Sequence, residues 1–152
     1  MKLKLIPFLG LLLVMACGGV NKSTGTQVPT SSTLNTLGKS QTWQLVAMRG
    51  KAVPSATTLV FNPEAGTLGG FAACNNYFCT YNAKLTASDA DGDHYALTVK
   101  LEGGGSIGCP EAVMNAEARY LALLGKADGM LVTAYTLTLT QRGKEILKYE
   151  LQ

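Results

Sequence analysis

The sequence predicts an α+β domain, an antiparallel β roll or open barrel with one crossover helix, preceded by a signal peptide and a flexible tether. Short segments in which apolar and polar side chains alternate run through residues 41–152, as expected of half-buried strands. One segment, residues 109–124, has the spacing of an amphipathic helix. A series of strands interrupted by a single helix is typical of a roll or barrel.

Turn residues separate the expected strands. The segments expected to be strands are 42–48, 57–61, 67–73, 84–87, 94–101 and much of 130–151. Residues 57–61 and 67–73 flank an Asn-Pro-Glu-Ala-Gly turn at 62–66, so we expect these two strands to pair as a hairpin. In the second strand, Gly69 and Gly70 indicate a bend or a close approach by another backbone.

The expected helix begins at Cys109-Pro110-Glu111, because proline suits the first turn and glutamate complements the positive end of the helix dipole. Gly125 ends it. Its apolar stripe comprises Val113, Ala116, Tyr120, Leu121 and Leu124.

The first sixteen residues have the features of an export signal. Lys2 and Lys4 precede an apolar run, residues 5–16, that is too short for a spanning helix. The run leads into Val14-Met15-Ala16-Cys17, which resembles the lipobox of bacterial lipoproteins. We therefore expect cleavage after residue 16 and attachment of fatty acids such as palmitate to Cys17. No acidic residue of the kind that retains some lipoproteins at an inner membrane follows Cys17, which favours the outer membrane.

The mature chain is expected to consist of a lipidated tether, residues 17–40, and one folded domain, residues 41–152. The tether is rich in Ser, Thr and Gly, and it has too few apolar residues to offset its ordering entropy. Without Lys2 and Lys4, 11 of the 13 basic residues remain, against 10 acidic ones. This near-neutral balance argues against a clustered basic surface and against nucleic-acid binding.

Residues 71–81 resemble the META-domain, or HslJ-like, family. That family has Gly-Cys-Asn, any residue, an aromatic, any residue, Gly, any residue and Tyr at this point. Four positions of this chain match the pattern: Cys74, Asn75, Tyr77 and Tyr81. Ala73 and Cys79 stand where glycines are expected, and a side chain at position 79 is expected to disturb the loop geometry.

A second block of the same family, which ends in a cysteine before a helix with an inward glutamate, resembles residues 105–110 followed by Glu117 and Tyr120. With Trp43-Gln44-Leu45 and the closing strands, the resemblance covers about residues 42–151. It implies a small cracked barrel or roll that is often lipid-anchored and linked to stress response or envelope integrity. It supplies no catalytic residues and no cofactor.

Three cysteines remain beside Cys17, so an oxidising compartment should produce one disulfide and one free thiol, or an intermolecular bond. We favour Cys74–Cys109, because both lie in the family blocks, and Cys79–Cys109 is the alternative. In the favoured pairing Cys79 is a reactive thiol, and Cys79→Gly is expected to be neutral or stabilising. A thiol enzyme would need His94 as the base for Cys79 or Cys109.

Several polar residues have a structural interpretation as well as a functional one. Asn75, Tyr77 and Tyr81 either line a ligand cleft or shape the loop through buried hydrogen bonds. Glu117 is expected to be a helix-surface or capping residue, because no second carboxylate is spaced to act with it.

Three aspartates, Asp89, Asp91 and Asp93, resemble the start of a calcium loop. Gly92 and Lys100 occupy the wrong places for such a loop. An acidic hairpin turn is therefore favoured, and we expect no metal site.

These observations predict a non-enzymatic, monomeric envelope lipoprotein that is a binding or stress-protection module, with an unknown protein or a small hydrophobic ligand as its partner. The first alternative is a carrier of a hydrophobic ligand or peptide inside the barrel. The alternative from another class is a thiol-based enzyme or redox protein that uses Cys79, Cys109 and His94. An apolar pocket would support binding, whereas His94 within hydrogen-bond reach of a free cysteine would support catalysis.

Overall fold

The structure is a computed structural model that describes residues 41–53 and 56–152. Most of these residues lie in antiparallel strands. The strands are β1 (Thr42–Met48), β2 (Lys51–Ala52), β3 (Thr58–Asn62), β4 (Thr67–Phe71), β5 (Asn76–Asp89), β6 (Gly92–Gly104), β7 (Gly129–Val132), β8 (Thr136–Gln141) and β9 (Lys144–Leu151). The helix α2 (Glu111–Leu124) connects β6 to β7. The predicted signal peptide, Cys17 and the tether lie outside the described residues.

Pairing between the first and last strands closes the sheet into a barrel. Each strand from β3 to β9 pairs antiparallel with the next, and β1 pairs with both β3 and β9. The short β2 extends the edge of β1 beyond β3, at Ala47 and Met48. The α+β antiparallel architecture with one helix is therefore confirmed. The β1–β9 pairing makes it a closed barrel of eight strands, β1 and β3 to β9.

The barrel interior holds the core, as the alternating pattern predicts. Trp43 and Leu45 on β1, Leu137 and Leu139 on β8, and Tyr149 on β9 are all almost fully buried. Trp43 and Leu45, like Leu137 and Leu139, are separated by one residue whose side chain points outward, which is the two-residue period of a strand. Burial of such side chains stabilises the fold by roughly 1.5–3 kcal/mol each.

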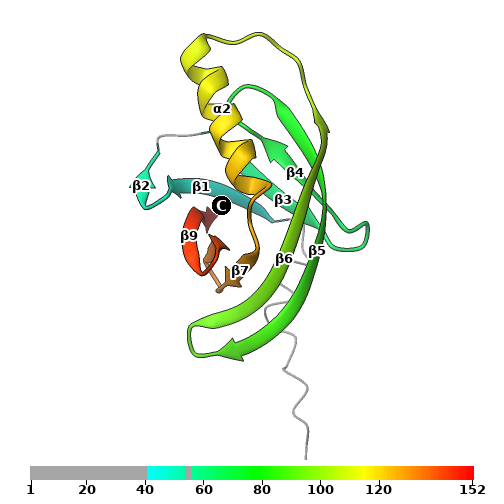
Figure 1. Cartoon of the computed structure of the whole chain (residues 1–152), viewed down its shortest axis with the longest axis vertical. Helices are drawn as coiled ribbons and strands as arrows, with labels where there is room; N and C mark the ends of the chain where they lie inside the picture. Colours follow the sequence, from blue (N-terminus) through cyan, green and yellow to red (C-terminus); the bar gives the residue numbers. More distant parts are fainter. Residues whose placement is uncertain (1–40, 54–55) are drawn as a thin grey trace, which may run out of the picture.

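The segment between β4 and the predicted strand at 84–87 differs from expectation. No strand is predicted over residues 74–83, but β5 begins at Asn76 and continues to Asp89. Tyr77 and Cys79 face inward and alternate with exposed neighbours, and β5 pairs with β4 on one side and β6 on the other. Asparagines and cysteines in the motif mask this alternation. In Figure 1, β5 and β6 form one long curved hairpin.

Helix α2 lies across the barrel on the side of β1 (Figure 1). Its C-terminal half packs on the core through Tyr120, Leu123 and Leu124, which are buried. Val113 and Ala116, which belong to the predicted apolar stripe, are only half-buried. Within the described residues, no helix combines the length and apolar character needed to cross a bilayer.

Two glycines on β4 permit a close approach between backbones, as their positions predict. A Cβ on Gly70 would overlap the carbonyl group of Thr58, and a Cβ on Gly69 would lie 2.7 Å from the carbonyl oxygen of Tyr77. Neighbouring strands therefore pack against β4 at distances that only glycine allows.

We predict that Gly70→Ala lowers the free energy of unfolding by at least about 2 kcal/mol, because the added methyl group meets rigid backbone. Gly103→Ala is the matched control, since a Cβ at Gly103 on β6 meets no atom within 4 Å. Urea denaturation followed by circular dichroism measures both. Equal stability of the two variants would contradict the steric argument.

Candidate functional site

A disulfide joins the start of α2 to the loop before β5. Cys74 and Cys109 are bonded with their Cα atoms 6.2 Å apart, which is the pairing that the sequence analysis favoured. The bond spans 35 residues, so on the chain-entropy model it stabilises the fold by about 4 kcal/mol. Cys74 Sγ also lies 3.4 Å from the carbonyl oxygen of Ile107; this is a contact, since a disulfide sulfur carries no proton to donate.

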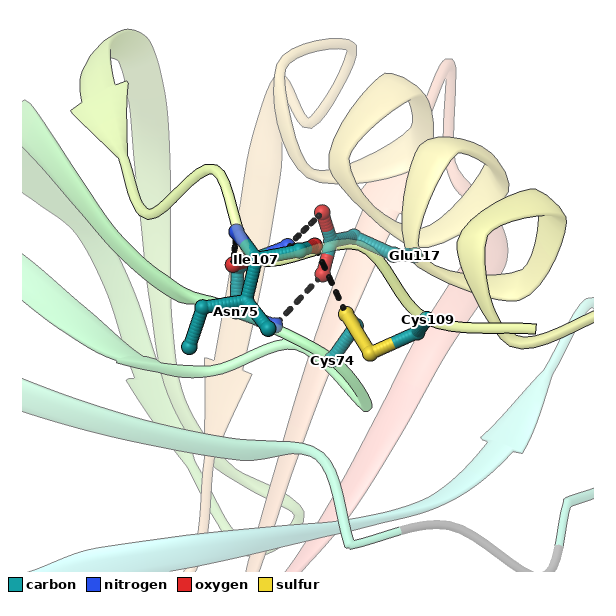
Figure 2. The surroundings of a disulfide bond; sticks show 5 residues. All are labelled: Cys74, Asn75, Ile107, Cys109 and Glu117. Atoms are coloured by element: carbon teal, nitrogen blue, oxygen red, sulfur yellow. Dashed lines mark hydrogen bonds between the residues drawn. A yellow bond between two sulfur atoms is a disulfide. The ribbon is translucent and has the colours of Figure 1, made fainter. Parts of the chain in front are cut away.

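Asn75 connects the same loop to α2 and to the segment before it (Figure 2). Its backbone N–H and its side-chain amide donate to the two carboxylate oxygens of Glu117, at 2.7 and 3.2 Å. Its side chain also accepts from the Ile107 N–H at 2.8 Å and donates to the Ile107 carbonyl at 3.2 Å. The buried Asn75 thus has the loop-shaping role, and Glu117 is its structural partner.

The two positions where the family has glycine differ in backbone conformation. Ala73 has a φ of 70°, in the left-handed region that favours glycine, whereas Cys79 is not among the residues with positive φ. The expectation that a side chain at Cys79 disturbs a loop is therefore wrong, because Cys79 lies within β5 and faces the core. The cost of a left-handed backbone conformation therefore falls at Ala73.

A chain of tyrosine hydroxyls links the middle of α2 to the barrel interior. The Tyr149 hydroxyl donates to that of Tyr120 at 3.1 Å, and the Tyr120 and Tyr77 hydroxyls are 2.7 Å apart. Tyr77 donates to the carbonyl of Thr58 at 2.9 Å, so Tyr120 must donate to Tyr77. Burial raises the pKa of all three phenols, which keeps them protonated.

Tyr81, the remaining residue of the first block, packs edge-on against Phe61 with ring centroids 5.1 Å apart. Burial raises the pKa of its phenol. Neither Tyr81 nor Asn75 nor Tyr77 lines the groove described next. The structure therefore brings Asn75 and Tyr77 into contact with α2, and it places Tyr81 elsewhere on the barrel.

An apolar groove of about 450 Å³ lies between the N-terminal half of α2 and the barrel. Its lining residues are Leu45, Met48, Val53, Ala56, Thr57, Ala73, Ala112, Val113, Ala116, Arg119 and Tyr120. Most of them are apolar, and the volume falls within the range of small-molecule sites, roughly 300–1,000 Å³. We call this feature the α2 groove.

The apolar stripe predicted for the helix did not locate the α2 groove, because periodicity identifies the apolar face of a helix and not how closely that face packs. The first half of α2 contributes small side chains to this face, Ala112 and Ala116 beside Val113, and the second half contributes large ones, Leu123 and Leu124. Small side chains leave space where large ones fill it. This change in side-chain size along the helix is the sequence signal that could have located the groove.

Cys79 is the free cysteine among the described residues, but it is not the reactive thiol that the sequence analysis expected. It is 1% exposed, and burial together with the negative charge of Glu102 raises the pKa of its thiol to about 11. His94 pairs with Ala87, eight residues along β5 from Cys79, or roughly 26 Å at 3.3 Å per residue. The structure does not bring these two side chains together.

The three aspartates shape the β5–β6 turn. Asp89 accepts from the Asp91 N–H at 2.9 Å and lies 3.3 Å from the imidazole of His94, while Asp93 accepts from the Ser88 hydroxyl. The Asp91 N–H and His94 lower the pKa of Asp89. No group of three or more His, Cys, Asp or Glu side chains within residues 41–53 and 56–152 is arranged to hold a metal ion.

These features define a small antiparallel β-barrel whose single crossover helix is fastened to it by a disulfide, an Asn–Glu pair and a tyrosine chain. The sequence matches the model of the META domain over residues 33–152, and the protein belongs to the META domain family. The resemblance seen in the two sequence blocks is thereby confirmed.

A solved structure has a similar fold. The NMR structure of a protein from Burkholderia xenovorans superposes with a TM-score of 0.55 at 24% sequence identity, covering 77% of this chain and 85% of that one. At this identity the likeness shows the fold alone. No curated protein matches the sequence significantly.

We predict that Cys79→Gly destabilises the fold by about 2–3 kcal/mol, and the earlier expectation of a neutral or stabilising effect is reversed. The substitution removes a core side chain and places glycine inside a strand. Lys84→Gly, at an exposed position of β5, has the backbone cost alone, about 1 kcal/mol. Thermal unfolding compares them, and equal losses would mean that the Cys79 side chain adds no packing energy.

Proposed function

We propose that this META domain protein is a non-enzymatic, lipid-anchored binding module of the bacterial cell envelope that holds a hydrophobic ligand in the α2 groove. The single observation that carries the proposal is an apolar groove left open between a helix and a barrel that are firmly fastened together. A monomer is sufficient for this role, since the helix and barrel of one chain form the whole groove.

The groove, and not the barrel interior, is the favoured binding place. Interior side chains such as Trp43, Leu59 and Leu139 are at most 1% exposed and belong to one continuous core. The lining of the α2 groove includes apolar side chains that are only partly covered, among them Val53, Val113 and Ala116. An apolar ligand there would remove exposed apolar surface from water without displacing the core.

The chemistry of the cysteines supports a binding role over a thiol-based enzyme or redox protein. Cys74 and Cys109 are joined, and Cys79 is buried, protonated at neutral pH and distant from His94. A thiolate nucleophile needs a lowered pKa and a neighbouring base, and Cys79 has neither. The stress-protection role that the family resemblance implies would then follow from sequestering hydrophobic molecules.

We predict that wild-type protein binds the neutral apolar dye N-phenyl-1-naphthylamine saturably, and that Ala112→Phe weakens binding about tenfold, a loss of about 1.4 kcal/mol. Phenylalanine at Ala112 fills the groove. Ala118→Phe is the control, since Ala118 is exposed on the same helix and does not line the groove. Dye fluorescence reports affinity; equal affinities for the two variants, or no saturable binding, would overturn the proposal.

The membrane anchor is tested separately. We predict that Cys17→Ser releases the protein from the membrane fraction, because the acyl chains on Cys17 are the proposed anchor. Metabolic labelling with palmitate should mark the wild type and not the variant. Separation of inner and outer membranes on a density gradient then tests the outer-membrane expectation. Continued labelling of Cys17→Ser would refute lipidation at this residue.

A further inference from the structure

Basic side chains gather next to the α2 groove. Two adjoining hollows of about 430 and 460 Å³ share Arg49 in their linings. Six basic residues line them, a set that we call the cationic rim: Arg49, Lys51, Arg119, Lys126, Arg142 and Lys144. The described part of the chain has nine basic and ten acidic residues, so two thirds of its basic side chains belong to the cationic rim.

Acidic side chains do not neutralise the rim. Of the ten acidic residues, Glu145 alone lines the hollows. Asp128 lies nearby, but its carboxylate accepts the Arg142 backbone N–H at 2.8 and 3.0 Å. The side-chain ion pairs of the described residues, His94–Asp89 and Lys100–Glu102, involve no member of the rim. The rim therefore presents positive charge to solvent.

The α2 groove and the cationic rim are continuous. Met48 and Arg119 line both the groove and the hollow that contains Lys51 and Lys126. Arg119 lies in the sequence between the groove residues Val113 and Ala116 and the rim residue Lys126, which follows α2. An apolar slot that opens onto a cluster of cations is complementary to a molecule with a hydrocarbon chain and a negatively charged head.

We propose that the α2 groove and the cationic rim together bind an anionic lipid with a single acyl chain, the chain in the groove and the carboxylate or phosphate head over Arg119, Lys51 and Lys126. This inference rests on the proposed function and names the ligand class of that site. Guanidinium and ammonium groups donate charge-assisted hydrogen bonds to such a head. The partial negative charge at the end of α2 offsets only a fraction of several full positive charges.

The test compares three probes on the full chain carrying Cys17→Ser, which avoids the detergent that an anchored protein requires. Calorimetry measures dodecyl phosphate and dodecyl maltoside below their micellar concentrations, and inorganic phosphate. We expect dodecyl phosphate to bind at least about tenfold more tightly than either other probe. Added salt should reduce this preference, since screening weakens the contacts of the head.

Lys126→Glu should abolish the preference for dodecyl phosphate while dodecyl maltoside binds as before, because Lys126 belongs to the cationic rim and does not line the α2 groove. Lys84→Glu changes the net charge equally at an exposed position outside the rim, and it should leave the preference intact. Equal binding of both amphiphiles by the unmodified groove would overturn the anionic assignment and leave the proposed function standing. Binding of inorganic phosphate as tight as dodecyl phosphate would overturn it in favour of a simple anion site, and failure of both amphiphiles to bind would overturn both proposals.

Discussion

The arrangement of helix and barrel depends on the hydrogen bonds made by the Tyr120 hydroxyl. This hydroxyl accepts a hydrogen bond from Tyr149 and donates one to Tyr77, and the Tyr77 hydroxyl donates to the carbonyl of Thr58. Every donor in this chain has an acceptor, so a polar group from the helix is accommodated inside an apolar barrel. A helix without this chain could slide or rotate over the barrel mouth, since apolar packing alone has little directional preference.

The other fastening holds the start of α2. The Cys74–Cys109 disulfide ties the chain just before the helix, and the Asn75–Glu117 pair ties its second turn to the same loop. With α2 held at its start and at Tyr120, the small residues between them face the barrel without filling the space. The α2 groove is therefore a consequence of the fastening, because a free helix would move inward and bury Val113 and Ala116.

Charge shows how composition can mislead. The near-neutral balance of charge outside the predicted signal peptide argues against a clustered basic surface, yet six basic side chains line two adjoining hollows. They come from the β1–β2 hairpin, from α2 and the segment after it, and from the β8–β9 hairpin, which are far apart in sequence. Net charge is a sum over the whole chain, so it does not indicate where on the surface the charged residues lie.

The sequence by itself determined the local features of this protein: the alternation that makes Trp43 and Leu45 face inward, the boundaries of α2, the glycines of β4 and the disulfide between the two family blocks. These follow from residues close together in the chain or from a short motif. Only the tertiary structure decided that β1 meets β9, that Cys79 is buried and that a groove adjoins a cationic rim. The first depends on how strands about a hundred residues apart align, and the others on how separate segments of the chain meet. Periodicity along one segment carries no record of the segment it will pair with.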